Sequence, residues 1–269
     1  MVIPPETRPE SATVRTFTQK IAMRYSSLIL ILTFLTIQSA IGQGTAYIIK
    51  GGPSVGFQQW NGFERDPLLS YNVSLAAESL SGDDQFSLFA QIGYHNRGSA
   101  IIYRSQILNI DNRPITVPDD RFVFRNIGLQ LGAKSRLPIN STFRGYYSFA
   151  LRGEYNISTN LDQYQEINEI ARIPFYPFDE REGPWGVREI VYGVSVAGGL
   201  EFSFSDLVMG VIELSVHPDL VAQYEQPALE NVTSPITGNR ITIPERSIRN
   251  TTLELSIGLR LLRKVEYID

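Results

Sequence analysis

Hydrophobic and polar residues alternate strictly between Thr252 and Leu261, where the sequence reads T-L-E-L-S-I-G-L-R-L. Successive side chains of a β-strand point to opposite faces. One face of this segment is therefore purely aliphatic, while the other carries threonine, glutamate, serine, glycine and arginine. The pattern predicts a strand that separates an apolar environment from a polar one.

Seven further segments show a similar alternation, and each reaches the roughly 9–11 residues that a membrane-spanning strand needs. Eight such segments predict an all-β fold, an eight-stranded antiparallel up-and-down transmembrane β-barrel. The predicted strands are Tyr47–Trp60, Leu69–Glu78, Phe86–Tyr103, Phe122–Lys134, Arg144–Tyr155, Glu189–Phe204, Leu207–His217 and Ile248–Leu262.

The connections between these strands are alternately longer and shorter. Outer-membrane barrels are built in this way, with short turns in the periplasm and longer loops outside. Ten strands would need another hairpin in the third of the longer loops, Asn156–Arg188. Pro174, Pro177 and Pro184 disfavour regular pairing there. The short connections are Ser79–Gln85, Pro138–Phe143 and Ser205–Asp206, and the longer ones are Asn61–Leu68, Arg104–Arg121, Asn156–Arg188 and Pro218–Ser247.

A soluble lipocalin-like barrel that carries a lipophilic ligand is an alternative, because the alternation alone does not say which face is inside. The aliphatic faces carry almost no charge, which favours a lipid-facing exterior. The polar faces are rich in serine and glycine, which fit a narrow interior. The glycines on these faces are Gly52, Gly56, Gly93, Gly128, Gly132, Gly193, Gly199 and Gly258.

The N-terminal part of the chain has the pattern of an export signal. Arg24 precedes an apolar run from Leu28 to Ile37, and small residues lead to a cleavage point before Gln43. The run is too short for a spanning helix of roughly 20 residues and is typical of a secretory signal peptide. We expect a bacterial outer-membrane location. The expected division is an over-long start or disordered extension at 1–22, a signal peptide at 23–42 and the barrel at 43–269.

Composition narrows the function further. The chain has no cysteine, which excludes disulfides and cysteine-based metal sites, and its net charge of −4 is too small to suggest nucleic acid as a partner. It contains no G-x-S-x-G, H-E-x-x-H or glycine-rich phosphate loop. We therefore expect no cofactor and a non-enzymatic role.

Charged residues on the polar faces are expected to point into the lumen. Eight strands leave a lumen just wide enough for side chains to fill. A buried charge without a partner costs several kcal/mol, so nearly balanced charges predict a structural ion-pair network. A narrow channel is the alternative. The network consists of Lys50, Lys134, Arg152, Arg260, Glu78, Glu154, Glu201, Glu213 and Glu254.

The two histidines, His95 and His217, are expected at the outer rim of the lumen. A histidine beside Ser215 and Glu213 would support acyl-ester hydrolysis, so an outer-membrane lipid-modifying hydrolase is a further alternative. Hydrogen bonds from rim histidines to loop groups are the simpler interpretation. Two histidines are too few for a zinc site, and no metal is expected.

The loop Asn156–Arg188 is richer in apolar residues than a simple connection requires. These side chains either fold over the mouth of the barrel or form a contact surface for an envelope partner. Aromatic residues near the strand ends fit the two interfaces of a bilayer, which makes outer-membrane lipid an expected partner. The candidate contact residues in the loop are Phe175, Tyr176, Phe178 and Trp185.

Three short segments resemble the small outer-membrane β-barrel domain of Bacteroidota, including its PorT-like group. They are Gln43, the opening I-I-K-G-G-P-S-V-G-F, and F-A-Q-I-G-Y-H-N-R-G-S with Tyr94, Arg97 and Gly98. The resemblance implies an integral outer-membrane barrel with a structural or docking role and links it to type IX secretion proteins as partners. The chain departs from the usual pattern at its C-terminus, where K-V-E-Y-I-D replaces a terminal aromatic residue.

Overall fold

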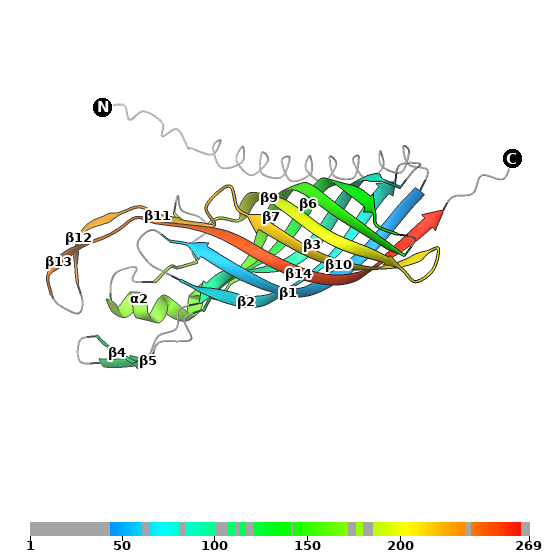
Figure 1. The fold of residues 1–269 in the computed structure, drawn as a ribbon. Helices are drawn as coiled ribbons and strands as arrows, with labels where there is room; N and C mark the ends of the chain where they lie inside the picture. Colours follow the sequence, from blue (N-terminus) through cyan, green and yellow to red (C-terminus); the bar gives the residue numbers. More distant parts are fainter. Residues whose placement is uncertain are drawn as a thin grey trace, which may run out of the picture. The chain divides into compact units, whose positions relative to one another are not determined.

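The computed structural model describes residues 44–60, 65–80, 84–100, 107–110, 113–116, 121–140, 142–171, 176–179, 185–234 and 238–264. The expected signal peptide and the extension before it lie outside these residues, as does Phe175. Eight antiparallel strands form a closed barrel (Figure 1), which confirms the predicted fold class. The barrel strands are β1 (Gly44–Gln59), β2 (Asp66–Leu80), β3 (Phe86–Ala100), β6 (Arg121–Pro138), β7 (Phe143–Thr159), β9 (Ile190–Ser203), β10 (Val208–Pro218) and β14 (Arg246–Lys264).

The first and last strands close the barrel. β1 pairs with β14 from Gly44 opposite Lys264 to Gln59 opposite Arg249. Each of the other barrel strands pairs with the next barrel strand along the chain. Short connections lie at one end of the barrel, the turn end, between β2 and β3, β6 and β7, and β9 and β10. The opposite end is called the loop end below.

Several strands continue beyond the ranges that alternation predicts. β6 runs to Pro138 and β7 to Thr159, whereas the pattern ends at Lys134 and Tyr155. β3 is assigned to Ala100, and the segment after it lies outside the described residues. The extensions follow from continued pairing with neighbouring strands, which does not require an apolar side chain at every second position.

The longer connections contain regular structure that the sequence patterns did not predict. β8 and β11 extend the barrel sheet beside β14, and the hairpins β4–β5 and β12–β13 form two-stranded sheets of their own (Figure 1). Among the described residues, no helix is both long and apolar enough to cross a bilayer. These elements are β4 (Ile107–Ile110), β5 (Arg113–Thr116), η1 (Leu161–Tyr164), α2 (Gln165–Ala171), β8 (Gly186–Val187), β11 (Tyr224–Gln226), β12 (Leu229–Thr233) and β13 (Arg240–Ile243).

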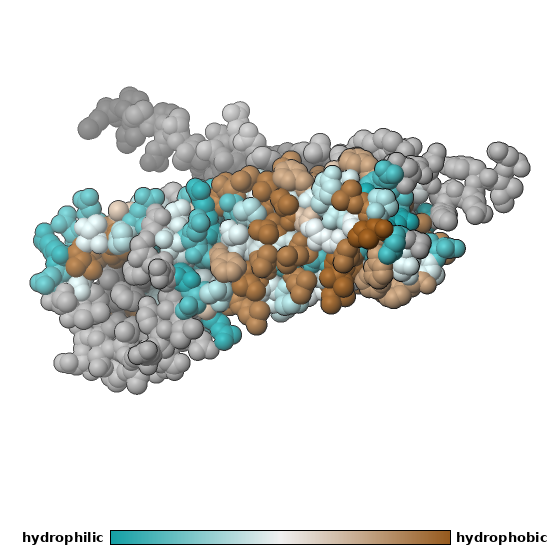
Figure 2. All heavy atoms as spheres, viewed as in Figure 1, coloured by the Kyte–Doolittle hydropathy of each residue, from teal (hydrophilic) through white to brown (hydrophobic). Residues whose placement is uncertain are grey.

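The barrel is apolar outside and polar inside. On β14, Ile257 is 63% exposed, whereas Glu254 and Arg260 are buried in the lumen. Figure 2 shows hydrophobic side chains over the visible outer surface of the strands. From Leu253 to Leu261 the apolar face of β14 spans roughly 27 Å along the strand. This arrangement contradicts the soluble-carrier alternative, which places the aliphatic face inside.

A second, hydrophobic core lies at the loop end, and we call it the cap cluster. The inward-facing Phe122 and Phe124 of β6 belong to it, so it reaches into the end of the lumen. The remaining members come from the loops and from the strand ends that adjoin them. The buried members are Phe122, Phe124, Leu161, Tyr164, Ile167, Tyr176, Val187, Tyr224, Ile243 and Ile248.

Glycines on the lumen face leave room for larger side chains. A Cβ atom at Gly199 would lie 2.6 Å from the hydroxyl of Tyr146, and one at Gly193 would lie 2.2 Å from a guanidinium nitrogen of Arg152. A methyl group fits at neither position, because a backbone oxygen also lies too close, that of Ile212 at 2.5 Å for Gly199 and that of Pro218 at 2.6 Å for Gly193. The neighbouring Gly198 faces outward, and its nearest atom would be 3.8 Å away.

We expect Gly199→Val to destabilise the barrel by about 1–3 kcal/mol, because overpacking a filled interior forces side chains from their preferred positions. Gly198→Val is the matched control, since its side chain would point out of the barrel. The measurement is the temperature at which each variant unfolds in detergent. Equal temperatures for both variants would contradict a tightly packed lumen.

Candidate functional site

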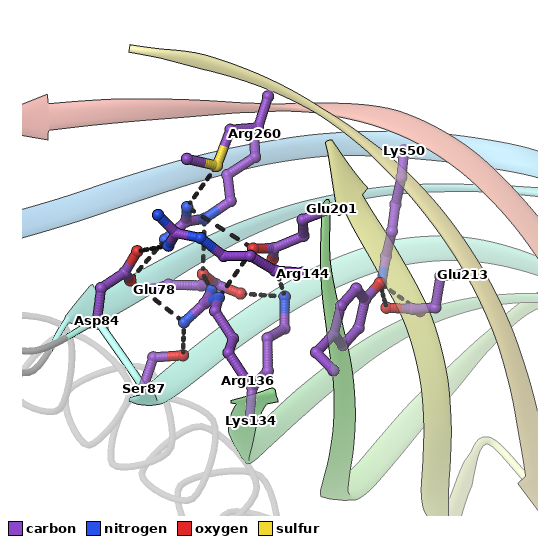
Figure 3. Close-up of polar contacts among 12 residues, drawn as sticks. Lys50, Glu78, Asp84, Ser87, Lys134, Arg136, Arg144, Glu201, Glu213 and Arg260 are labelled. Atoms are coloured by element: carbon purple, nitrogen blue, oxygen red, sulfur yellow. Dashed lines mark hydrogen bonds and ion pairs between the residues drawn. The ribbon is translucent and has the colours of Figure 1, made fainter. Parts of the chain in front are cut away.

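The turn end of the lumen holds a cluster of charged side chains from four strands and one turn (Figure 3). Glu78 contacts Lys134, Arg136 and Arg260. Glu201 accepts a hydrogen bond of 2.9 Å from Arg136 Nε and lies 3.6 Å from Lys134 Nζ. These groups carry opposite charges at short range, and all five side chains are buried. We call these five residues, together with Asp84, the turn-end cluster.

Asp84 ties the turn between β2 and β3 to this cluster. Its carboxylate oxygens lie 3.1 Å from Arg260, 3.4 Å from Arg136 and 2.6 Å from the more exposed Arg144. Asp84 has a φ of 53°, in the left-handed region that few residues other than glycine adopt. The three arginine contacts hold its side chain across the opening of the lumen.

One ion pair occupies the middle of the lumen. Lys50 Nζ lies 2.6 Å from Glu213 Oε1 (Figure 3). The hydroxyl of Tyr146 donates to Glu213 Oε2 at 2.8 Å. The ring of Tyr146 also lies 4.4 Å from Lys134 Nζ, which connects this pair with the turn-end cluster through a cation–π contact.

The two histidines flank a single carboxylate. His95 Nδ1 lies 2.8 Å from Glu254 Oε1, and His217 Nε2 lies 3.3 Å from Glu254 Oε2. His217 also contacts two hydroxyls, Ser195 Oγ at 2.8 Å from Nδ1 and Ser215 Oγ at 2.9 Å from Nε2. The group combines a histidine, a carboxylate and two hydroxyls, the residue types that nucleophilic catalysis uses.

The alternation pattern predicts both histidines at the exposed outer rim, and the structure places them elsewhere. Both side chains are buried, and their partners are strand residues of the lumen rather than loop groups. Glu213 neighbours His217 in the sequence but pairs with Lys50 instead. The carboxylate that contacts His217 is Glu254, on the strand that pairs with β10.

A further charged cluster lies between the histidines and the cap cluster. Arg97 Nε donates to Glu154 at 2.6 Å. Arg152 bridges Glu154 and Asp219 at 2.6 and 2.7 Å. Asn126 also donates to Glu154, at 2.9 Å. The carboxylate of Glu154 is therefore surrounded by donors, which offsets much of the cost of burying its charge.

The structure brings all nine predicted network residues into the lumen and adds others. Among the described residues, seven acidic side chains there contact seven lysine and arginine side chains and the two histidines. Their near balance is what a narrow interior requires, because water cannot solvate an unpaired charge. The additions are Asp84, Arg97, Arg136, Arg144 and Asp219.

The alternation of polar and apolar residues predicts a lumen position for only some of these five additional residues. Arg97 lies on the polar face of the third predicted strand, so its lumen position follows from the pattern. Arg136 lies beyond the end of the alternating pattern, and Asp84 and Asp219 lie in connections. Their contacts depend on how the connections fold.

The cavity found in the lumen is small. One cavity of about 20 Å³ lies between the turn-end cluster and the histidines, lined among others by Lys50, Gln91, Lys134, Glu213 and His217. This volume holds about one water molecule. In the part of the chain that the structure describes, no group of three or more histidine or acidic side chains is placed to hold a metal ion.

The candidate contact residues of the third loop divide between two environments. Tyr176 is buried in the cap cluster and stacks on Tyr164 with ring centroids 4.8 Å apart. Phe178 packs against the same cluster and lies edge-on to Tyr224. Trp185 is 39% exposed. Two of these residues thus fold over the mouth, while Trp185 is available to a partner.

We expect Arg260→Leu to destabilise the barrel by about 3–5 kcal/mol, because the substitution leaves buried carboxylates with too few cations. Arg263→Leu is the matched control, since Arg263 is exposed on the same strand. Unfolding temperatures in detergent give the comparison. An Arg260→Leu barrel as stable as the control would show that the ion pairs contribute no net stability.

Comparison with known proteins shows similarity in fold alone. No protein-family model and no curated protein matches the chain. Neisserial surface protein A is 9% identical, with 83% of this chain and 98% of that chain covered and a TM-score of 0.43. The attachment invasion locus protein Ail of Yersinia pestis is 12% identical, with 81% and 99% covered and a TM-score of 0.38. The outer membrane protease OmpT from Escherichia coli is 9% identical, with 83% and 98% covered and a TM-score of 0.37. At this identity no functional argument follows, and the resemblance to the Bacteroidota family gains no support.

Proposed function

We propose that this protein is an integral outer-membrane β-barrel whose filled lumen makes it a structural or docking component of the bacterial envelope. One observation carries the proposal: the closed barrel is apolar outside and holds paired charges inside. In water, this outer surface would expose far more contiguous apolar area than a monomeric soluble protein usually tolerates. In a bilayer, the same surface is solvated by lipid.

A transport role is disfavoured by the contents of the lumen. The turn-end cluster, the Lys50–Glu213 pair, the Glu254 group and the Arg97–Glu154 pair come from strands all around the barrel. The cap cluster adds apolar side chains at the loop end. A solute would have to displace several buried ion pairs to pass.

The cap cluster supports a docking role. It gives the loop end a hydrophobic core of its own, which fixes the loops around it. The exposed Trp185 and the hairpin of β12 and β13 are then presented on a rigid base. We infer that an envelope protein binds here, and the PorT-like resemblance suggests secretion proteins as one class to test by co-purification.

A hydrolase is the second candidate, and the contacts of His217 with Ser195, Ser215 and Glu254 favour it. Against it, Ser195, Ser215 and His217 face a cavity of about 20 Å³, which has no room for an acyl chain. We infer that the group is structural. Serine-directed fluorophosphonate labelling and lipid profiles of cells that express Ser195→Ala test this inference, and any loss of labelling or of a lipid product would establish the enzyme.

We expect the full chain to fractionate with the outer membrane and to migrate differently on a denaturing gel before and after boiling, because closed barrels unfold only on heating in detergent. Ile257→Arg should weaken assembly by about 2–4 kcal/mol, since it places a charge within the apolar band. Thr251→Arg, on the same face nearer the loop end, should cost at most about 1 kcal/mol. A soluble protein that is indifferent to both substitutions would refute the proposal.

In planar bilayers, we expect the purified protein to show no discrete conductance steps, because the lumen is filled along its length. The double variant Glu78→Ala and Glu201→Ala removes two carboxylates of the turn-end cluster, and its conductance tests whether this cluster blocks the lumen. Stepwise currents from the unaltered protein would establish the channel alternative instead.

A further inference from the structure

One arginine lies on the outer surface of the barrel, where the neighbouring side chains are apolar or aromatic. Arg125 belongs to the outward-facing side of β6, between Val123 and the exposed Ile127. Its side chain is half-buried and reaches toward β7. There it contacts Ser158 Oγ at 3.3 Å and the carbonyl oxygen of Thr159 at 3.5 Å. Both contacts are long, and both partners are uncharged.

Arg125 differs in this respect from the arginines of the lumen. Arg97, Arg136 and Arg260 each contact at least one carboxylate. Among the described residues, no carboxylate forms an ion pair with Arg125. A half-buried guanidinium without a counter-ion is costly at an apolar surface, and in proteins such a group normally finds an anion.

Polar groups from three other strands, β2, β3 and β7, lie near Arg125. Asn96 of β3 lies directly opposite it in the strand register. Tyr94 lies two residues before Asn96 on the same outward face of β3. The rings of Tyr71 and Tyr94 lie 6.0 Å apart. We call Tyr71, Tyr94, Asn96, Arg125 and Ser158 the outer-surface site.

The site has an unused acceptor as well as an unpaired cation. Asn96 is only 7% exposed, and its Oδ1 atom finds no hydrogen-bond donor among the described residues. A ligand that completes the site therefore needs an anionic group for Arg125. An adjacent hydroxyl or amine would satisfy Asn96.

The position of the site selects the source of this anion. It lies at the loop end of the apolar surface beside Tyr71 and Tyr94, and tyrosine is enriched where membrane proteins meet the bilayer interface. Lipid phosphates lie at this level, beside the hydroxyls and amines of their headgroups. Arginine binds phosphate through charge-assisted hydrogen bonds with a planar, forked geometry.

We propose that the outer-surface site binds the phosphate of a membrane lipid headgroup, with Arg125 as the principal ligand and the Tyr94 hydroxyl and Asn96 beside it. The proposal rests on the proposed function, because it requires the outer surface to face lipid. It adds a specific lipid contact to a surface that otherwise meets lipid only through apolar side chains.

Native mass spectrometry of the full-length protein in detergent tests the proposal, with diphosphorylated lipid A and its dephosphorylated form as probes. We expect binding to need the phosphates. Arg125→Gln should weaken it about tenfold, the ratio that corresponds to one lost charge-assisted hydrogen bond. Tyr94→Phe should weaken it by less. Arg249→Gln, which alters an exposed arginine on β14, is the matched control and should bind as the unaltered protein does.

Two outcomes would overturn the inference: equal binding by Arg125→Gln and the unaltered protein, or displacement of the lipid by an equal concentration of inorganic phosphate. The second result would show that the site takes a free anion. The heat-dependent gel shift is recorded for every variant. If Arg125→Gln shows the gel shift and binds lipid A as the unaltered protein does, the lipid site is refuted and the membrane barrel is not. If the unaltered protein shows no shift, the proposed function itself fails.

Discussion

Charge pairing in a narrow lumen is the constraint on which this structure depends. Eight strands enclose little more than their own inward side chains, so each ionised group must find its counter-ion within the barrel. Glu78 receives three cations, Asp84 receives three arginines and Glu154 receives two. Glycines at Gly193 and Gly199 supply the space that Arg152 and Tyr146 occupy. The lumen therefore balances its buried charges and fills its volume with the same side chains.

The two ends of the lumen are closed by different physical means. At the turn end, Asp84 holds three arginines by charge, and the connection that carries it is short. At the loop end, apolar side chains of the cap cluster exclude water. This difference follows the chain, because the short turns have no room for a hydrophobic core, whereas the longer loops can fold one.

The alternation of side chains predicts the eight strands and the direction of each side chain, because both follow from a period of two residues. It does not predict how deep a residue lies. Depth depends on strand tilt and on the offset between neighbours, and for this reason His95 and His217 were expected at the rim. Asp84 and Asp219 escaped prediction because connections follow no period. Helix α2 escaped it because its seven residues are too few for a reliable helical pattern.

The pairs that fill the lumen join residues far apart in the chain. Lys50 and Glu213 are 163 positions apart, and Glu78 and Arg260 are 182 apart. During synthesis, Lys50 and Glu78 emerge long before their partners exist. Lys50 of β1 reaches Glu213 of β10 only when β14 has paired with both strands. Closure of the barrel wall and formation of this central ion pair therefore require the same strand, and a chain truncated before Arg246 lacks it.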